Sequence, residues 1–409
     1  MRASLLLASL ILVACPEPLP STDAGSGGGT ATGGGASTGG GASTGGGTAT
    51  GGGASTGGGA STGGGASTGG GAATGGGAAT GGGAATGGGS TGTLLTVGVG
   101  GDRRYSTTDG NLTIQGDQQD LAPTDADWAD GHTDTMIRGL CYGAGRFLAV
   151  GGQSNATYRS SVDGLTWTAL TTLDGMAGRA DASWFGGCAY GNGRFVAAGG
   201  NGSRCYSTDA LTWMCPAPYQ SFHHRSVAFG GGRFVTVGNS YAMPAVHITS
   251  VSSDGSTWTD LPALNNTQAN LIIWVESHRA FYAVFGNTLG TLAASGTSWT
   301  AVAGVDVSGV NGATVKDDTV YFIGTRPMAP YTNFLISSAN GTQWNTQQPN
   351  LSAESIHWDQ QGYFVGNRTR YPTPTIPVRL RSTDGVTWTE VSEATSLHGV
   401  SRFATGTIP

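Results

Sequence analysis

The sequence predicts an all-β protein, a seven-bladed β-propeller that follows a long disordered segment. Three observations support this fold class. Residues 25–92 are almost entirely Gly, Ala, Ser and Thr, so they cannot bury enough apolar surface to offset the entropy of ordering a chain. From Leu94 onward a short motif recurs about every 45 residues, and the intervals contain short apolar runs separated by turn residues.

The N-terminus has the features of an export signal. Met1 and Arg2 supply a positive end, and the apolar run from Ala3 to Val13 is too short to cross a bilayer. With the cysteine that follows, this stretch resembles a bacterial lipoprotein signal. The resemblance implies that residues 1–14 are removed and that Cys15 is acylated and anchors the chain in the lipid bilayer. The alternative is an ordinary secretory signal in which Cys15 has no role.

Residues 15–93 form a linker built on the hexad G-G-G-x-x-T, which runs from Gly27 to Thr86. A Gly-rich coil of this length has a root-mean-square span of roughly 45 Å, so it would hold residues 94–409 away from a membrane without fixing their orientation. Packed polyglycine sheets or helices are the alternative. Pro16, rather than an aspartate, follows the cysteine, which resembles lipoproteins sent to the outer membrane or the cell surface.

The repeat begins after this linker. Four copies read S-x-D-[GA]-x-T-W: Ser161 to Trp167, Ser207 to Trp213, Ser252 to Trp258 and Ser382 to Trp388. Two degenerate copies end at Trp299 and Trp344, and a seventh, Thr107 to Thr113, has lost its tryptophan. The spacing is typical of four-stranded propeller blades.

Each unit contains four runs that predict strands. The second run is apolar at successive positions, as in Arg146 to Val150, Arg194 to Ala198 and Arg233 to Val237, which favours a sheet packed between two others. The first unit starts at Leu94 with its second strand. Leu397 to Ser401 is similar to the first strand at Ile137 to Cys141, so we expect the C-terminal segment to close the ring.

The motif resembles the Asp-box of the BNR-repeat, sialidase-like propellers, although each copy is one residue shorter between Asp and Trp. The resemblance implies a hairpin between the third and fourth strands, with the aspartate bonded to the turn and the tryptophan between blades. Four aspartates and their tryptophans are therefore interpreted as structural: Asp163, Trp167, Asp209, Trp213, Asp254, Trp258, Asp384 and Trp388. The same reasoning makes Arg146, Arg194 and Arg233 structural, because they recur at strand starts.

The four remaining cysteines suit an oxidising compartment. Cys205 and Cys215 flank one motif, and Cys141 and Cys188 occupy nearly equivalent positions in neighbouring units, so of three connectivities we expect these two pairs. The sequence contains no C-x-x-C motif of the kind that binds zinc, and we expect no metal and no cofactor. Asp125, Asp127, Asp130, His132 and Asp134 lie close together but lack the spacing of an EF-hand, which favours a solvated loop over a calcium site.

The candidate ligand site lies in the loops between second and third strands. These loops are long in three units, and they carry Tyr241, Arg326, Tyr331, Arg368, Arg370 and Tyr371. Aromatic rings stack on apolar faces and guanidinium groups bind carboxylates, which suits a glycan or a peptide. The alternative is surface loops without a role. With 19 Lys and Arg against 25 Asp and Glu, the chain has no basic field that would attract nucleic acid.

Three functions are compatible with these observations. The first is a binding module for a glycan or protein, tethered in the bacterial envelope and expected to be a monomer. The second is a sialidase-like glycoside hydrolase, and the third is an assembly factor for an envelope complex, as the resemblance to Asp-box propellers of photosystem assembly implies. The hydrolase is disfavoured because the chain lacks the family's Arg-Ile-Pro motif and no catalytic residue can be nominated. Enzymatic activity is therefore not expected.

Overall fold

The computed structural model describes residues 92–100, 103–107, 137–152, 155–173, 184–216, 222–328, 330–370, 376–393 and 402–408. All belong to one compact unit, Ser67–Pro409. The lipoprotein signal, the linker up to residue 91, the acidic loop from Asp125 to Asp134, and Tyr371 lie outside the described residues. Within those residues, two short 3-10 helices, Gly200–Gly202 and Leu264–Asn266, are the helical elements. No helix among them has the length and apolar character needed to cross a bilayer.

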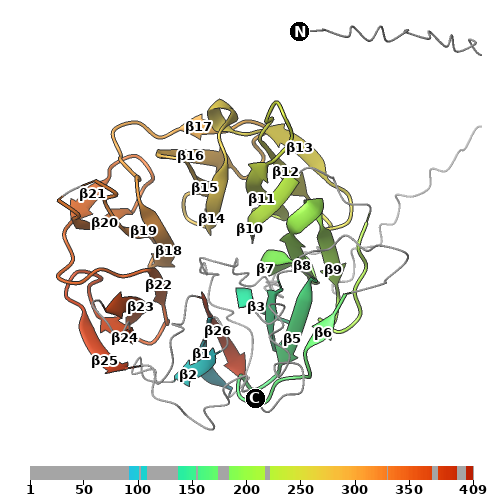
Figure 1. The fold of residues 1–409 in the computed structure, drawn as a ribbon, viewed down its shortest axis with the longest axis horizontal. Coiled ribbons are helices and arrows are strands. Elements are labelled where there is room, and N and C mark those ends of the chain that lie inside the picture. Colours follow the sequence, from blue (N-terminus) through green and yellow to red (C-terminus); the bar gives the residue numbers. More distant parts are fainter. Residues whose placement is uncertain are drawn as a thin grey trace, which may run out of the picture. The chain divides into compact units, whose positions relative to one another are not determined.

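The described strands form antiparallel sheets arranged as a β-propeller (Figure 1). Six sheets are each formed by one continuous stretch of chain, and we number these blades 1 to 6. Blade 1 contains β3 (Ile137–Gly143), β4 (Arg146–Gly151), β5 (Thr157–Ser161) and β6 (Thr171–Thr172). Blade 2 contains β7 (Phe185–Gly191), β8 (Arg194–Gly199) and β9 (Arg204–Ser207). Blade 3 contains β10 (Phe222–Gly230), β11 (Arg233–Ser240), β12 (Ile248–Ser252) and β13 (Thr259–Pro262).

Blades 4 to 6 repeat the same order. Blade 4 contains β14 (Ala269–Val275), β15 (Ala280–Phe285), β16 (Thr288–Ala293) and β17 (Thr300–Ala301). Blade 5 contains β18 (Val310–Lys316), β19 (Thr319–Thr325), β20 (Asn333–Ser338) and β21 (Asn345–Gln347). Blade 6 contains β22 (Ser355–Trp358), β23 (Phe364–Arg370), β24 (Ile376–Ser382) and β25 (Thr389–Glu393).

The two ends of the propeller meet in a different sheet, which we call the closing sheet. It contains β1 (Thr93–Gly100), β2 (Arg103–Thr107) and β26 (Arg402–Ile408), in the order β2-β1-β26. The C-terminal strand therefore pairs with the N-terminal one, as the sequence predicted. The prediction of a seven-bladed propeller is corrected to six blades of contiguous chain and one sheet that combines both ends, for which the structure describes three strands.

The closing strand also differs from the predicted one. The sequence placed it at Leu397 to Ser401, but the strand begins at Arg402, and residues 394–401 lie outside the described part of the chain. The reason is a glycine at the end of the first strand. A Cβ on Gly143 would lie 2.0 Å from the Tyr190 ring, and one on Gly406 would lie 2.2 Å from the Tyr142 ring. Gly406 is thus the equivalent of Gly143, which shifts the alignment by three residues.

The first strands line the centre of the ring. Contacts run in the order β3, β7, β10, β14, β18, β22, β26 and back to β3 (Figure 1). Gly191 and Gly230 repeat the close approach to an aromatic ring of the next blade, to Phe229 and Trp274. The closing sheet joins blade 6 through His357, whose Nε2 lies 2.7 Å from Thr405 Oγ1. Because every sheet is packed on both faces, second strands such as β8 are almost fully buried.

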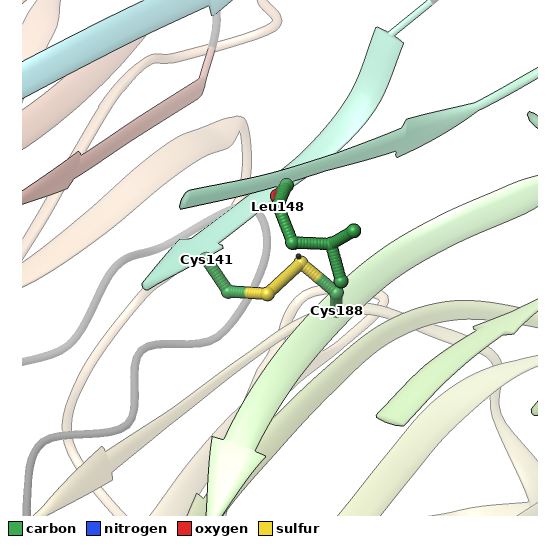
Figure 2. Close-up of a disulfide and its surroundings, with 3 residues drawn as sticks. All are labelled: Cys141, Leu148 and Cys188. Atoms are coloured by element: carbon green, nitrogen blue, oxygen red, sulfur yellow. Dashed lines mark hydrogen bonds between the residues drawn. A yellow bond between two sulfur atoms is a disulfide. The ribbon is translucent and has the colours of Figure 1, made fainter. Parts of the chain in front are cut away.

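Both predicted disulfides are confirmed. Cys141 on β3 and Cys188 on β7 join the first strands of blades 1 and 2, with the Cys188 sulfur beside the carbonyl of Leu148 (Figure 2). Cys205 and Cys215 join the two arms of a hairpin in blade 2. In that blade the fourth strand is reduced to one bridge between Tyr206 and Met214. The second disulfide therefore holds the outer edge of the one blade that lacks a full fourth strand among those described.

Candidate functional site

The propeller has two unlike ends. The hairpin end holds the turns from first to second strands and the S-x-D hairpins that follow the third strands. In blade 1, for example, Arg146 follows the first turn and donates to Ser160, next to the start of the motif at Ser161. At the loop end lie the connections between second and third strands and the connections from blade to blade. A ligand site could use either end, so we describe both.

At the hairpin end the motif aspartates bond to their own turns. Asp163 Oδ1 accepts hydrogen bonds from the Leu165 and Thr166 amides (2.8 and 2.7 Å) and from Ser161 Oγ (2.9 Å). Asp209, Asp254 and Asp384 repeat this pattern. The Thr212 amide bond is the largest influence on Asp209 and lowers its pKa to about 2. These carboxylates are therefore ionised and already engaged in turn structure.

The motif tryptophans are placed by the same hairpins. Trp167, Trp258 and Trp388 donate from Nε1 to the carbonyl of the motif glycine. In blade 2 an alanine, Ala210, takes the glycine position with φ of 61°, and Trp213 packs at 3% exposure without that bond. The hairpins also receive arginines from the preceding blade. Arg194 donates to the Asp254 carbonyl (2.7 Å), and Arg233 donates to Ala293 and Gly296 in blade 4.

At the loop end, two arginines named by the sequence have internal partners. Arg326 forms an ion pair with Asp306 (2.9 Å) and lies over the Phe334 ring, and Arg368 lies 3.5 Å from Glu390. Tyr331 is 73% exposed, and Arg370 is the last residue of β23. The two ion pairs arise because each guanidinium faces a carboxylate on a neighbouring segment of its own blade or of the connection leading to it. The structure thus places Tyr241 next to blade 3, Arg326 and Tyr331 in blade 5, and Arg368 and Arg370 in blade 6, while Tyr371 lies outside the described residues.

Tyr241 does belong to a cluster, but with residues that the sequence did not single out. Its ring centroid lies 4.5 Å from that of His223, and its hydroxyl donates to Asn201 Oδ1 (3.2 Å). The His223 ring in turn lies 5.4 Å from Trp184, and His223 Nδ1 accepts the Asn201 amide (3.1 Å). Tyr241, His223 and Trp184 thus form a row of rings at the loop ends of blades 2 and 3.

Two arginines lie against the end of this row. The guanidinium carbon of Arg138 is 5.1 Å from the centroid of Trp184, and that of Arg225 is 5.0 Å from it. Trp184 directly precedes β7, and β7 lies between β3, which carries Arg138, and β10, which carries Arg225. The indole is therefore flanked by cations from the blades on either side. Such contacts contribute about 0.5–2 kcal/mol each.

Each guanidinium is fixed through one nitrogen. Arg138 Nε donates to the Gly152 carbonyl (2.9 Å), and Arg225 Nε donates to Asn239 Oδ1 (2.8 Å). A guanidinium has five N–H donors, so four on each arginine have no partner among the described residues. Neither arginine has an ion pair there. Burial, and the charge of Arg225, lower the pKa of Arg138, while burial lowers that of Arg225. Both cations therefore lie against one indole ring, and no carboxylate of the described structure forms an ion pair with either of them.

The backbone explains why these side chains reach the site. Five first strands contain a β-bulge at one equivalent position, and the extra residues are Arg138, Gly186, Arg225, Asn270 and Asn311. A bulge redirects the side chain of the extra residue. Gly186 is required there, since a Cβ would lie 2.5 Å from the His224 carbonyl oxygen. The sequence contained a signal for this equivalence, because Arg138 and Arg225 each stand five residues before the glycine that ends the first strand.

A third arginine, Arg402, lies next to Arg138. Arg402, the first residue of β26, donates from Nε to the Arg138 carbonyl (2.6 Å), and burial, with the charge of Arg138, lowers its pKa. Within the described ranges, no group of three or more His, Cys, Asp or Glu side chains could hold a metal ion. The site that the described residues support is therefore cationic and aromatic. We call Arg138, Trp184, His223, Arg225 and Tyr241 the arginine–aromatic site.

Comparisons with known proteins assign no family to the chain. No family model matches the chain, and no curated protein matches it. Among solved structures, it is similar to a 6-phosphogluconolactonase-like protein of Bacteroides fragilis (TM-score 0.46, 8% identity, 79% of this chain and 100% of that chain). It is also similar to the WD40 domain of Neurospora crassa Pan2 (0.44, 9%, 64% and 89%). A YCF48 structure bound to a D1 peptide has a TM-score of 0.43, with 15% identity over 68% of this chain and 90% of that one.

Proposed function

We propose that this protein is a tethered interaction module that binds a carboxylate-bearing segment of a partner protein at the arginine–aromatic site. The observation that carries the proposal is the state of Arg138 and Arg225. Each is oriented by one Nε hydrogen bond, and each keeps four N–H donors without a partner among the described residues. Preorganised donors of this kind favour binding because little side-chain entropy is lost on association.

The chemistry of the site selects an anion. Guanidinium groups bind carboxylates through two parallel hydrogen bonds, and such charge-assisted bonds are about twice as strong as neutral ones. The mutual repulsion of two half-buried cations is relieved when an anion binds beside them. Tyr241, at the other end of the row of rings and 47% exposed, offers ring surface against which an apolar part of the same ligand can pack.

Neighbouring apolar side chains favour a protein partner over a glycan. The loop between β11 and β12 carries Tyr241, Met243 and Val246, which are 47%, 93% and 61% exposed. Methionine on a surface suits contacts with apolar side chains. Because Tyr241 belongs to the site and shares this loop with Met243 and Val246, a bound peptide could contact both surfaces. Protein interfaces combine such apolar anchors with arginine and aromatic residues.

The location is part of the proposal. The export signal and the linker support a lipid anchor at Cys15 in a bacterial envelope, with the outer membrane or cell surface as the destination. We propose that the closing sheet is a seventh blade and that the S-x-D hairpins are Asp-boxes, as their hydrogen bonds to the turn support. The sialidase-like hydrolase stays an alternative that the experiment below can reveal.

The experiment compares two variants that each remove two positive charges at the loop end. Arg138→Gln with Arg225→Gln removes the two cations beside Trp184. The matched control, Arg326→Gln with Arg368→Gln, removes two ion-paired cations. Both proteins are tested on an array of acidic and neutral peptides, on a glycan array and with a fluorogenic sialoside.

The proposal expects binding of acidic peptides that falls at least tenfold in the first variant and little in the control. Binding of sialylated or uronic glycans alone would favour the glycan module, and turnover of the sialoside would favour the hydrolase. If replacing Arg368, Arg370 and Tyr371 with Ala abolished binding while the Arg138→Gln, Arg225→Gln variant bound normally, the ligand site would lie in the loops that the sequence predicted.

A further inference from the structure

The hairpin end exposes apolar side chains on two neighbouring blades. Four of the large apolar residues that are exposed in the described structure lie in the hairpins of blades 1 and 2: Val162 (47%), Leu165 (45%), Leu211 (45%) and Met214 (61%). We call these four residues the apolar patch. The other five lie at the loop end, in the segments that contain Tyr241 and Tyr331. Exposed apolar groups that gather in one region mark interaction surfaces.

The two hairpins are held against each other. Tyr158 in β5 of blade 1 donates from its hydroxyl to the Leu211 carbonyl in the hairpin of blade 2 (2.8 Å). The Cys141–Cys188 disulfide joins the same two blades at their first strands. Leu165 and Leu211 occupy one position of the motif, which is polar in blades 3, 4 and 5 (Ser256, Thr297 and Thr342) and holds the partly buried Val386 in blade 6. Among the described hairpins, an exposed large apolar side chain at this position thus occurs in blades 1 and 2, and the polar residues of blades 3 to 5 show that the hairpin does not require it.

The N-terminal segment joins the propeller at this same end. β1 pairs with β26 so that Thr93 faces Ile408, next to Gly406, and Gly406 is the equivalent of the glycine that ends each first strand at its hairpin turn. β1 also lies beside the hairpin of blade 1, since a Cβ on Gly164 would be 2.6 Å from Leu95 Cδ2 and 2.8 Å from Val97 Cγ2. Thr93, the first residue of β1, therefore lies at the hairpin end, and Leu95 lies against the hairpin that carries Val162 and Leu165.

We propose that the apolar patch docks the propeller on a lipid surface. This inference rests on the proposed lipid anchor at Cys15, because the anchor and the patch would then act on one membrane. A flexible linker gives a tethered group an effective concentration in the millimolar range, so a weak contact is enough. The four side chains would enter the boundary between headgroups and acyl chains. With a net charge of −6, the protein should prefer zwitterionic lipid to anionic lipid.

Docking in this way would orient the protein. The arginine–aromatic site lies at the loop end, opposite the hairpins, so it would face away from the membrane. A partner could then approach Arg138, Arg225 and Trp184 without competing with the lipid for the same surface. The long linker alone would leave this orientation free.

The test uses the full chain with Cys15→Ala, so that no acyl chain contributes, and vesicles of phosphatidylcholine as the probe. Co-sedimentation and hydrogen exchange of residues 161–167 and 207–215 are measured with and without vesicles. We expect weak binding, with slowed exchange in both hairpins. Leu165→Ser, Leu211→Ser and Met214→Ser together should reduce the bound fraction at least fivefold.

A matched control removes apolar groups from the opposite end. Met243→Ser, Val246→Ser and Met328→Ser replace exposed side chains at the loop end, and they should leave vesicle binding unchanged. Thermal unfolding of both variants establishes that they are folded. No vesicle binding by the Cys15→Ala chain, or equal losses in both variants, would overturn the docking proposal. Palmitate labelling of the Cys15 chain tests the anchor separately, so the two failures are distinguishable.

Discussion

Removing the Cys141–Cys188 disulfide should destabilise the propeller more than removing the Cys205–Cys215 disulfide. A cross-link lowers the entropy of the unfolded chain by an amount that grows with the loop it closes. The two bridges close loops with sequence separations of 47 and 10. The chain-entropy relation then gives about 4 kcal/mol for the first and about 3 kcal/mol for the second at 25 °C.

Packing increases this difference. Cys141 and Cys188 are both fully buried between the first strands of blades 1 and 2, whereas Cys215 is half-buried at the edge of blade 2 (Figure 2). Replacing a buried cysteine by alanine removes the sulfur, which leaves a small cavity and costs additional stability. At roughly 2.1 cal/mol/K per residue over about 300 residues, a loss of 4 kcal/mol lowers Tm by about 6 °C.

The assay compares two double variants, Cys141→Ala with Cys188→Ala and Cys205→Ala with Cys215→Ala, in urea unfolding and in calorimetry without reductant. The parent protein treated with dithiothreitol gives the loss of both bridges without substitution. We expect the free energy of unfolding to be highest for the parent, lower for the Cys205/Cys215 variant and lowest for the Cys141/Cys188 variant. The two variants should differ by about 1 kcal/mol or more. A first variant that is as stable as the second would refute the reasoning.

Three further predictions concern the ends of the chain and its histidines. Cys15→Ala should abolish palmitate labelling and release the protein from the membrane with its fold unchanged; label retained in the variant would contradict the lipoprotein signal. Deleting residues 402–409 removes β26 from the closing sheet and should lower stability by several kcal/mol, so an unchanged melting temperature would contradict closure by this strand. Between pH 7 and pH 5 the free energy of unfolding should fall, because burial lowers the pKa of His357 to about 3 and that of His224 far below its usual value. The unfolded chain then binds protons below pH ~6.5 that the folded chain does not, and the loss continues toward pH 3. His357→Gln should weaken this fall in urea midpoints, and an equal fall in parent and variant would count against the assignment.

The repeat made the strands and the cross-links predictable from sequence. Turn residues, apolar runs and motif spacing are local signals, and they placed the second strands correctly, as Arg146 to Val150 and Arg194 to Ala198 show. The cysteine pairs followed because equivalent positions in adjacent repeats lie side by side. The closing strand was displaced because its alignment depended on Gly406, whose role is set by contact with Tyr142 on another blade.

The candidate site was less predictable, because it depends on contacts between blades. Arg326 and Arg368 looked available in the sequence, but their partners, Asp306 and Glu390, come from segments that only the fold brings near. Arg138 and Arg225 looked like strand residues, and only the register of β3 and β10 shows that each is the extra residue of a bulge. A comparison of the repeats would have shown that the residue type at the bulge position differs from blade to blade, unlike the motif aspartates.

The closing sheet makes the order of synthesis important. A ribosome produces β1 and β2 long before β26, so the apolar residues Leu95, Val97 and Val99 lack their final partner until residues 402–408 have been synthesised. A chain cut short before residue 402 would contain every blade of contiguous sequence and still keep an unpaired edge on β1, which is a signal for aggregation or proteolysis. β26 therefore acts as a check on the propeller, because the ring closes only once residues 402–408 are present.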